Sequence, residues 1–149
     1  LVSKMHIFPT LLQLAALDRP GIGADGDLDG LSLIAAMNCV NDVPLREELL
    51  LEFHGLRFLY SQRGIVSRDR WKYIFTPGDR DEVYNLNDDP GELQNLVDEP
   101  QAEPKVEELR RRLYGAAIRA GDPLQDCIGK YFGRWENRSG QPDATEMYS

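Results

Sequence analysis

Histidine and cysteine are scarce in this sequence, and their scarcity limits the chemistry that it can carry. Its 149 residues include two histidines and two cysteines. Cys39 and Cys127 lie far apart, and neither has a Cys or His neighbour at the spacing of a metal site. We expect two reduced thiols, with a single disulfide as the alternative, and no metal ligands or cofactor in this chain.

Basic charge and long apolar runs are also missing. The formal net charge is -8, whereas surfaces that bind nucleic acids concentrate Lys and Arg. No apolar run approaches the length of a membrane span, and the N-terminus lacks the basic start and apolar core of a signal peptide. We therefore expect a soluble protein that binds neither nucleic acid nor membrane, in a compartment that the sequence leaves open.

A dense run of structural signals lies between residues 71 and 96. Trp71, Tyr73 and Phe75 recur at every second position, which is typical of a strand with one packed face. The Pro-Gly pair at 77–78 ends that strand, and residues 82–86 follow as the second strand of a hairpin. The sequence therefore predicts an antiparallel pair here.

A helix start is predicted directly after this hairpin. Asp89 can cap the first turn, Pro90 suits the first helical position, and Glu92 completes a capping-box pattern. Leu93, Leu96 and Val97 would form the buried side of this helix.

The flanking segments complete an α+β pattern. Residues 103–119 carry apolar side chains at helical spacing, and Arg110, Arg111 and Arg112 are expected on its solvated side beside Glu107 and Glu108. The sequence predicts a small antiparallel sheet of about four strands packed by this C-terminal helix. The strands are expected at 47–53, 65–67, 71–76 and 82–86, and an apolar, largely buried helix is expected within residues 1–17.

Several of these motifs together resemble a known family. The run Glu82-Val83-Tyr84-Asn85-Leu86, followed by Asp88-Asp89-Pro90-Gly91-Glu92 and Asn95-Leu96, is similar to the C-terminal signature of sulfatases. That family belongs to the alkaline phosphatase superfamily and includes arylsulfatases, choline-sulfatases and related phosphonate monoester hydrolases. The matching signature residues are Tyr84, Leu86, Asp89, Pro90, Glu92, Asn95 and Leu96.

The N-terminal part carries the same resemblance. Pro9-Thr10-Leu11-Leu12 and Asp29-Gly30-Leu31-Ser32-Leu33 resemble segments near the end of the sulfatase catalytic domain, with His6 where the family usually has Asp. The resemblance implies that residues 1–46 end an α/β catalytic domain as a helix, an Asp- and Gly-rich loop and a short helix. Residues 47–122 would then form the C-terminal α+β subdomain, and residues 123–149 an extended tail containing aromatic residues.

The catalytic parts of that family are missing from the sequence. Family sulfatases use a formylglycine made from Cys, beside a divalent metal such as calcium, and neither Cys39 nor Cys127 is followed by the matching Pro or Ala and Arg. The resemblance therefore implies that an intact parent sulfatase would hold the metal and the formylglycine. This chain, which begins with Leu1 rather than Met, is expected to be an inactive C-terminal fragment with no catalytic residues.

The resemblance also suggests candidate residues for a substrate rim. His54, Tyr60, Gln62 and Arg63 match elements that approach the active-site cleft in some sulfatases, and a cation there would attract sulfate oxygens. The alternative is that these side chains only pack. A separate hydrolase site that uses His54 with Ser61 or Ser67 lacks an ordered acid partner.

Two kinds of partner are expected. The remainder of the sulfatase catalytic domain would cover the apolar N-terminal helix, and the aromatic tail could join copies of the chain into a homo-oligomer. The alternative function is a stand-alone binding or oligomerisation module derived from the sulfatase C-terminal subdomain, which would have to expose this apolar surface.

Overall fold

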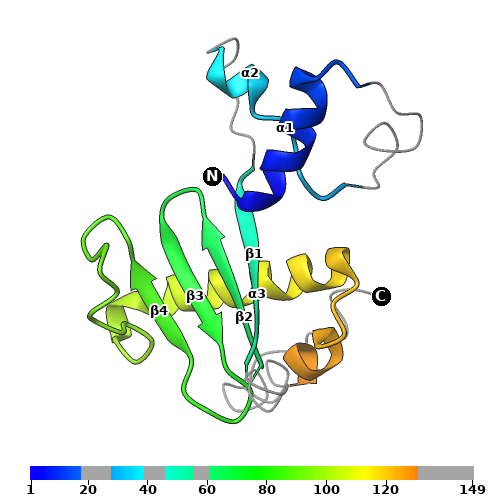
Figure 1. Ribbon diagram of the computed structural model, residues 1–149. Coiled ribbons are helices and arrows are strands. Elements are labelled where there is room, and N and C mark those ends of the chain that lie inside the picture. Colours follow the sequence, from blue (N-terminus) through cyan, green and yellow to red (C-terminus); the bar gives the residue numbers. More distant parts are fainter. Residues whose placement is uncertain (18–27, 39–45, 56–60, 131–149) are drawn as a thin grey trace. The chain divides into compact units, whose positions relative to one another are not determined.

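A computed structural model describes residues 1–17, 28–38, 46–55 and 61–130 of the chain. The chain divides into two compact units, Leu1–Leu49 and Leu50–Ser149. Figure 1 shows the elements of each unit. Among the described residues, no helix combines the length and the apolar character needed to cross a membrane.

The N-terminal unit is built from short helices. A 3-10 helix η1 (Lys4–His6) runs into α1 (Ile7–Leu14), and α2 (Ile34–Met37) follows later in the chain. The predicted helix within residues 1–17 is thus confirmed, but its burial is not. Exposed apolar side chains of this segment include Val2, Ile7, Phe8, Leu11, Leu14 and Leu17.

Hydrogen bonds from two helices hold the segment 29–33 in the N-terminal unit. The Nδ1 atom of the fully buried His6 accepts from Leu31 N at 2.8 Å, and Thr10 Oγ1 accepts from Leu33 N at 2.9 Å. A side chain at Gly30 would collide with the carbonyl group of Met5. The Asp-Gly-x-Ser-Leu pattern therefore marks a segment that must lie flat against η1.

The second unit contains the predicted α+β fold. Its sheet has the order β1-β2-β3-β4, and β2 with β3 and β3 with β4 pair antiparallel. These strands span Glu48–His54, Ser61–Ser67, Trp71–Phe75 and Glu82–Asn85. The predicted four-stranded antiparallel sheet is confirmed, with β2 beginning four residues earlier than the expected start at 65.

One long helix covers a face of this sheet. After the short η3 (Pro100–Ala102), α3 (Glu103–Ala120) crosses behind β2 and β3 in Figure 1. Its apolar stripe packs on the inward side chains of the strands. The main members of this core are Ile65, Tyr73, Phe75 and Val83 of the sheet and Val106, Leu109, Leu113, Ala116 and Ala117 of α3.

The end of α3 is fixed by a left-handed residue. Gly121 has φ of 61°, and Asp122 N donates to Ala117 O at 2.9 Å, which is the hydrogen bond of a Schellman cap. Residues 125–130 then form another helical segment, and Ile128 is fully buried in the core. The tail expected from residue 123 is therefore not extended at its start, because Ile128 supplies apolar surface to the core.

Candidate functional site

The signature residues lie around the outer side of β4. Backbone groups of Val83 in this strand and of Asp81 just before it are bonded by the chain that follows the strand. Asn95 Oδ1 accepts from Val83 N at 2.9 Å, Leu96 N donates to Val83 O at 2.9 Å, and Asn95 Nδ2 donates to Asp81 O at 3.0 Å. One Asn side chain thus replaces part of a fifth strand.

The predicted helix at Asp89 is wrong. Residues 88–99 form turns, and the Asp89 carboxylate accepts from Gln94 N at 2.9 Å within one of them. Glu92 has φ of 55°, outside the helical region, and Leu93 is 89% exposed. The hydrogen bonds that this segment makes with β4 determine its conformation, and they override the local preference for a helix that the capping residues indicate. Leu96 and Val97 do pack against the core, as expected.

Two other signature side chains make polar contacts, one with β3 and one within β4. Glu92 accepts from Lys72 Nζ of β3 at 2.6 Å, and Tyr84 donates its hydroxyl to Glu82 at 2.6 Å. Burial, the hydrogen bond to Glu82 and nearby carboxylates raise the pKa of Tyr84 to about 12. These contacts hold the segment that follows β4 against the sheet.

Arg63, a proposed rim residue, is only 1% exposed. Its Nη2 donates to Asp122 Oδ1 at 3.2 Å, its Nε donates to Asp122 Oδ2, and its Nη1 donates to Gln62 O at 2.9 Å. Burial raises the pKa of Asp122, but hydrogen bonds from Arg63 and Leu124 outweigh it and hold that pKa below its ordinary value. The pair joins β2 to the end of α3, and sequence reasoning missed Asp122, which directly follows the helix-ending Gly121.

The other rim candidates differ in their exposure. His54 at the end of β1 has its side chain 43% exposed, with Nε2 at 3.2 Å from Glu52 Oε2. Gln62 donates to Thr76 Oγ1 at 2.9 Å, and Tyr60 lies outside the described residues. The structure thus places His54 on the surface and Gln62 in a contact between β2 and the end of β3.

The expectation that Arg110, Arg111 and Arg112 all lie on the solvated side of the helix is wrong for Arg110. Arg110 is buried, and its Nη2 lies 3.4 Å from Asp81 Oδ2, which also accepts from Tyr73 Oη at 2.6 Å. Burial raises the pKa of Asp81 despite these donors. Arg110 lies four residues after Val106 and three before Leu113, so helical spacing places it on the core face.

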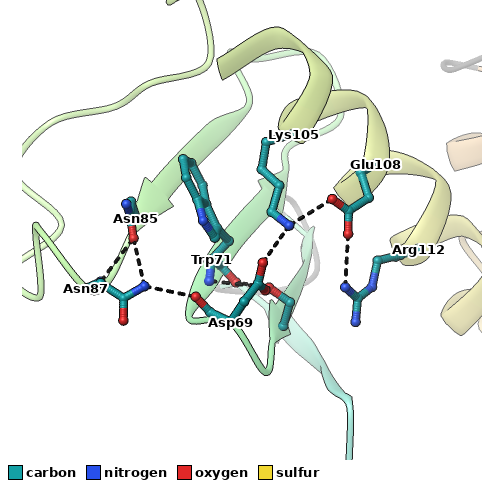
Figure 2. Close-up of polar contacts among 8 residues, drawn as sticks. Asp69, Trp71, Asn85, Asn87, Lys105, Glu108 and Arg112 are labelled. Carbon is teal, nitrogen blue, oxygen red and sulfur yellow. Dashed lines mark hydrogen bonds and ion pairs between the residues drawn. The ribbon is translucent and has the colours of Figure 1, made fainter. Parts of the chain in front are cut away.

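The remaining two arginines of that run are paired as expected. Arg111 contacts Glu107 at 3.5 Å, and Arg112 donates to Glu108 at 3.2 Å. Figure 2 shows that Lys105 extends this chain of contacts, with Nζ 2.8 Å from Glu108 and 2.6 Å from Asp69 in the β2–β3 turn. These contacts attach α3 to the sheet.

The described part of the chain contains neither a metal-ligand cluster nor a disulfide. Within residues 1–17, 28–38, 46–55 and 61–130, no group of three or more His, Cys, Asp or Glu side chains converges. Cys127 is an exposed free thiol, and Cys39 lies outside the described residues. The described residues therefore supply no ready ligand set for a divalent metal.

A four-stranded antiparallel sheet covered by α3, closed by turns that bond to the outside of β4, defines the class of the second unit as an α+β domain. The family model described as "N-sulphoglucosamine sulphohydrolase, C-terminal" matches residues 1–119. The chain belongs to this family, whose members are C-terminal portions of sulfatases.

Individual relatives agree with this assignment. The choline-sulfatase of Rhizobium meliloti strain 1021 is 30% identical over 103 residues, which make up 66% of this chain and 18% of that protein. The uncharacterized sulfatase YidJ of Escherichia coli K12 is 25% identical over 149 residues, 96% of this chain and 26% of that protein. The chain thus spans about a quarter or less of these two relatives.

A solved structure carries the same fold. BT1596, described as a 2-O GAG sulfatase, superposes with a TM-score of 0.65 and 25% sequence identity, covering 80% of this chain and 25% of that one.

Proposed function

We propose that the chain works as the C-terminal part of a longer sulfatase that hydrolyses sulfate esters. The observation that carries this proposal is the family match over residues 1–119, in a chain that spans only 18% of the choline-sulfatase it resembles. In that parent, the second unit would close one side of the active-site cleft. The chain by itself would be inactive.

The exposed apolar face of α1 supports the proposal that the chain has a partner in the parent protein. Phe8, Leu11 and Leu14 are each more than half exposed, and Leu14 reaches 64%. Apolar side chains gathered in this way usually belong to an interface. The remainder of the catalytic domain is the partner that the family match suggests.

The metal and the formylglycine of the parent would come from outside this chain. No described cluster fits a divalent cation, so no catalytic step is assigned to these residues. A substrate-rim role remains part of the proposal for His54, Tyr60 and Gln62, with His54 as the exposed member among the described residues. Arg63 would act there indirectly, since its guanidinium group is bonded to Asp122.

The test compares this chain with the longer reading frame that contains it. The longer protein should hydrolyse 4-nitrophenyl sulfate and lose that activity with a chelator, whereas the 149-residue chain should be inactive under both conditions. Chelator-sensitive hydrolysis by the chain alone would contradict the proposal. In the longer protein, His54→Ala should raise KM, and Glu103→Gln, an exposed change at the start of α3, should leave it unaltered.

The alternative is a stand-alone binding or oligomerisation module. Its discriminating property is the behaviour of the exposed α1 face. Leu11→Gln with Leu14→Gln should reduce self-association of the isolated chain, with Ile118→Gln on α3 as the control. A wild-type chain that stays monomeric at high concentration would weaken the fragment proposal, and of the two stand-alone roles it would favour binding over oligomerisation.

A further inference from the structure

A pocket of about 330 Å³ lies beside the signature turns in the second unit. Its apolar lining consists of the Trp71 indole of β3, Leu96 and Ala102. This volume is at the lower end of the range for small-molecule sites. None of the side-chain contacts described above for the rim or the sulfatase signature requires such a space.

The polar lining of the pocket combines three amide side chains, Asn85, Gln94 and Gln101, with charged groups that are all acidic. Asp88, Asp89 and Glu99 line it, and no Lys or Arg is among its lining residues. The Asp89 carboxylate is held ionised, since backbone N–H donors, first Gln94, lower its pKa. Lys72 follows Trp71 directly along β3, so its side chain lies on the other face of the sheet, where it is bonded to Glu92.

These features discriminate between ligand classes. Sulfate, phosphate and carboxylate groups would meet three acidic side chains without a compensating cation. A small hard cation needs several oxygens within about 2.6 Å of one point, and no described acidic side chains converge in that way. A larger organic cation can contact an indole and separated carboxylates together, because its charge is spread over apolar substituents.

We propose that this pocket binds a small organic cation of the methylated ammonium class. Trp71, Leu96 and Ala102 would contact the methyl groups, and Asp88, Asp89 and Glu99 would balance the charge. This site goes beyond the proposed function and does not depend on it.

The test is a calorimetric titration of the whole chain with tetramethylammonium chloride at constant ionic strength. Tert-butanol serves as the neutral comparator of similar shape, and sodium methyl sulfate serves as the anionic one. We expect saturable binding of tetramethylammonium and no saturable binding of the other two. Equal binding of tert-butanol, or no binding of tetramethylammonium, would overturn the proposal.

Two double variants with the same change in net charge separate a local site from general charge attraction. Asp88→Asn with Glu99→Gln removes two lining carboxylates and should weaken binding about tenfold. Glu103→Gln with Asp126→Asn neutralises two carboxylates outside the lining and should leave the affinity within about twofold. Equal weakening in both variants would refute the pocket, and thermal unfolding checks that each variant is folded. Either result leaves the sulfatase test intact, since that test measures ester hydrolysis.

Discussion

The ion pair between Arg63 and Asp122 offers a sharp test of the second unit. Their side chains are 1% and 0% exposed, so removal of either partner leaves a charge buried without its counterion. Breaking such a pair usually costs about 3–5 kcal/mol. Because Asn at position 122 keeps an oxygen for Leu124 N and removes the charge, Asp122→Asn should lower the free energy of unfolding by about that amount.

The assay is equilibrium unfolding in urea, followed by circular dichroism. The matched control is Arg80→Met, which breaks the exposed pair with Asp98, whose side chains are 60% and 73% exposed. That change should cost less than about 1 kcal/mol. The double variant Arg63→Met with Asp122→Asn should recover most of the loss, since no buried charge is left unpaired. A cost for Asp122→Asn equal to that of Arg80→Met would refute the reasoning.

The same pair predicts how stability depends on pH. The folded pKa of Asp122 lies below its ordinary value, so its stabilisation is fully present above the unfolded pKa of about 3.9. It is lost as the pH falls through the folded pKa. Wild type and Asp122→Asn should therefore approach each other in stability at acid pH, and a constant gap from neutral pH down to pH 2 would contradict this assignment.

Three further changes test other parts of the fold. Gly121→Ala should destabilise by about 1 kcal/mol because of its left-handed φ of 61°, whereas Gly115→Ala within α3 should stabilise by about 0.5–1 kcal/mol; the opposite order of melting temperatures would contradict the cap. The absorbance change on tyrosine ionisation that is lost in Tyr84→Phe should have its midpoint at about pH 12. The free energy of unfolding should fall between about pH 10 and that midpoint, because Tyr84 loses its proton at a lower pH in the unfolded chain than in the folded one. A midpoint near 10 would place Tyr84 in water. Asn95→Ala should cost about 2 kcal/mol in urea unfolding and Asn95→Asp less, since Asp keeps the acceptor for Val83 N; equal costs would mean that this acceptor is not used.

The sequence predicted the elements whose signals are repeated along the chain. Alternating aromatic residues marked β3, and apolar residues at helical spacing marked α3, because each pattern reflects one buried face. The motif resemblance placed the chain in the correct family. The first residue of β2 was harder to predict from the sequence, because Ser61 and Gln62 are polar and do not continue an apolar pattern.

Contacts between distant residues could not be predicted from local patterns. The capping signals at Asp89 and Glu92 were real, yet hydrogen bonds to β4 gave the segment a different conformation. A surface role for Arg63 was consistent with the sequence alone, because its partner Asp122 lies 59 positions further along the chain. The Trp71 pocket likewise depends on residues from β3 and from the turns after β4.

The way residues 88–96 lie along β4 has a consequence for solubility. A terminal strand normally offers unpaired N–H and C=O groups to which a strand of another molecule can bind. Here Asp81 O and both backbone groups of Val83 are bonded, and Asn85 O accepts from Asp89 N at 2.8 Å. The family signature thus covers the β4 edge of the sheet against intermolecular β-pairing. Asn95→Ala should therefore form thioflavin-positive aggregates faster than wild type at concentrations where both are folded, and equal rates would mean that the protection comes from elsewhere.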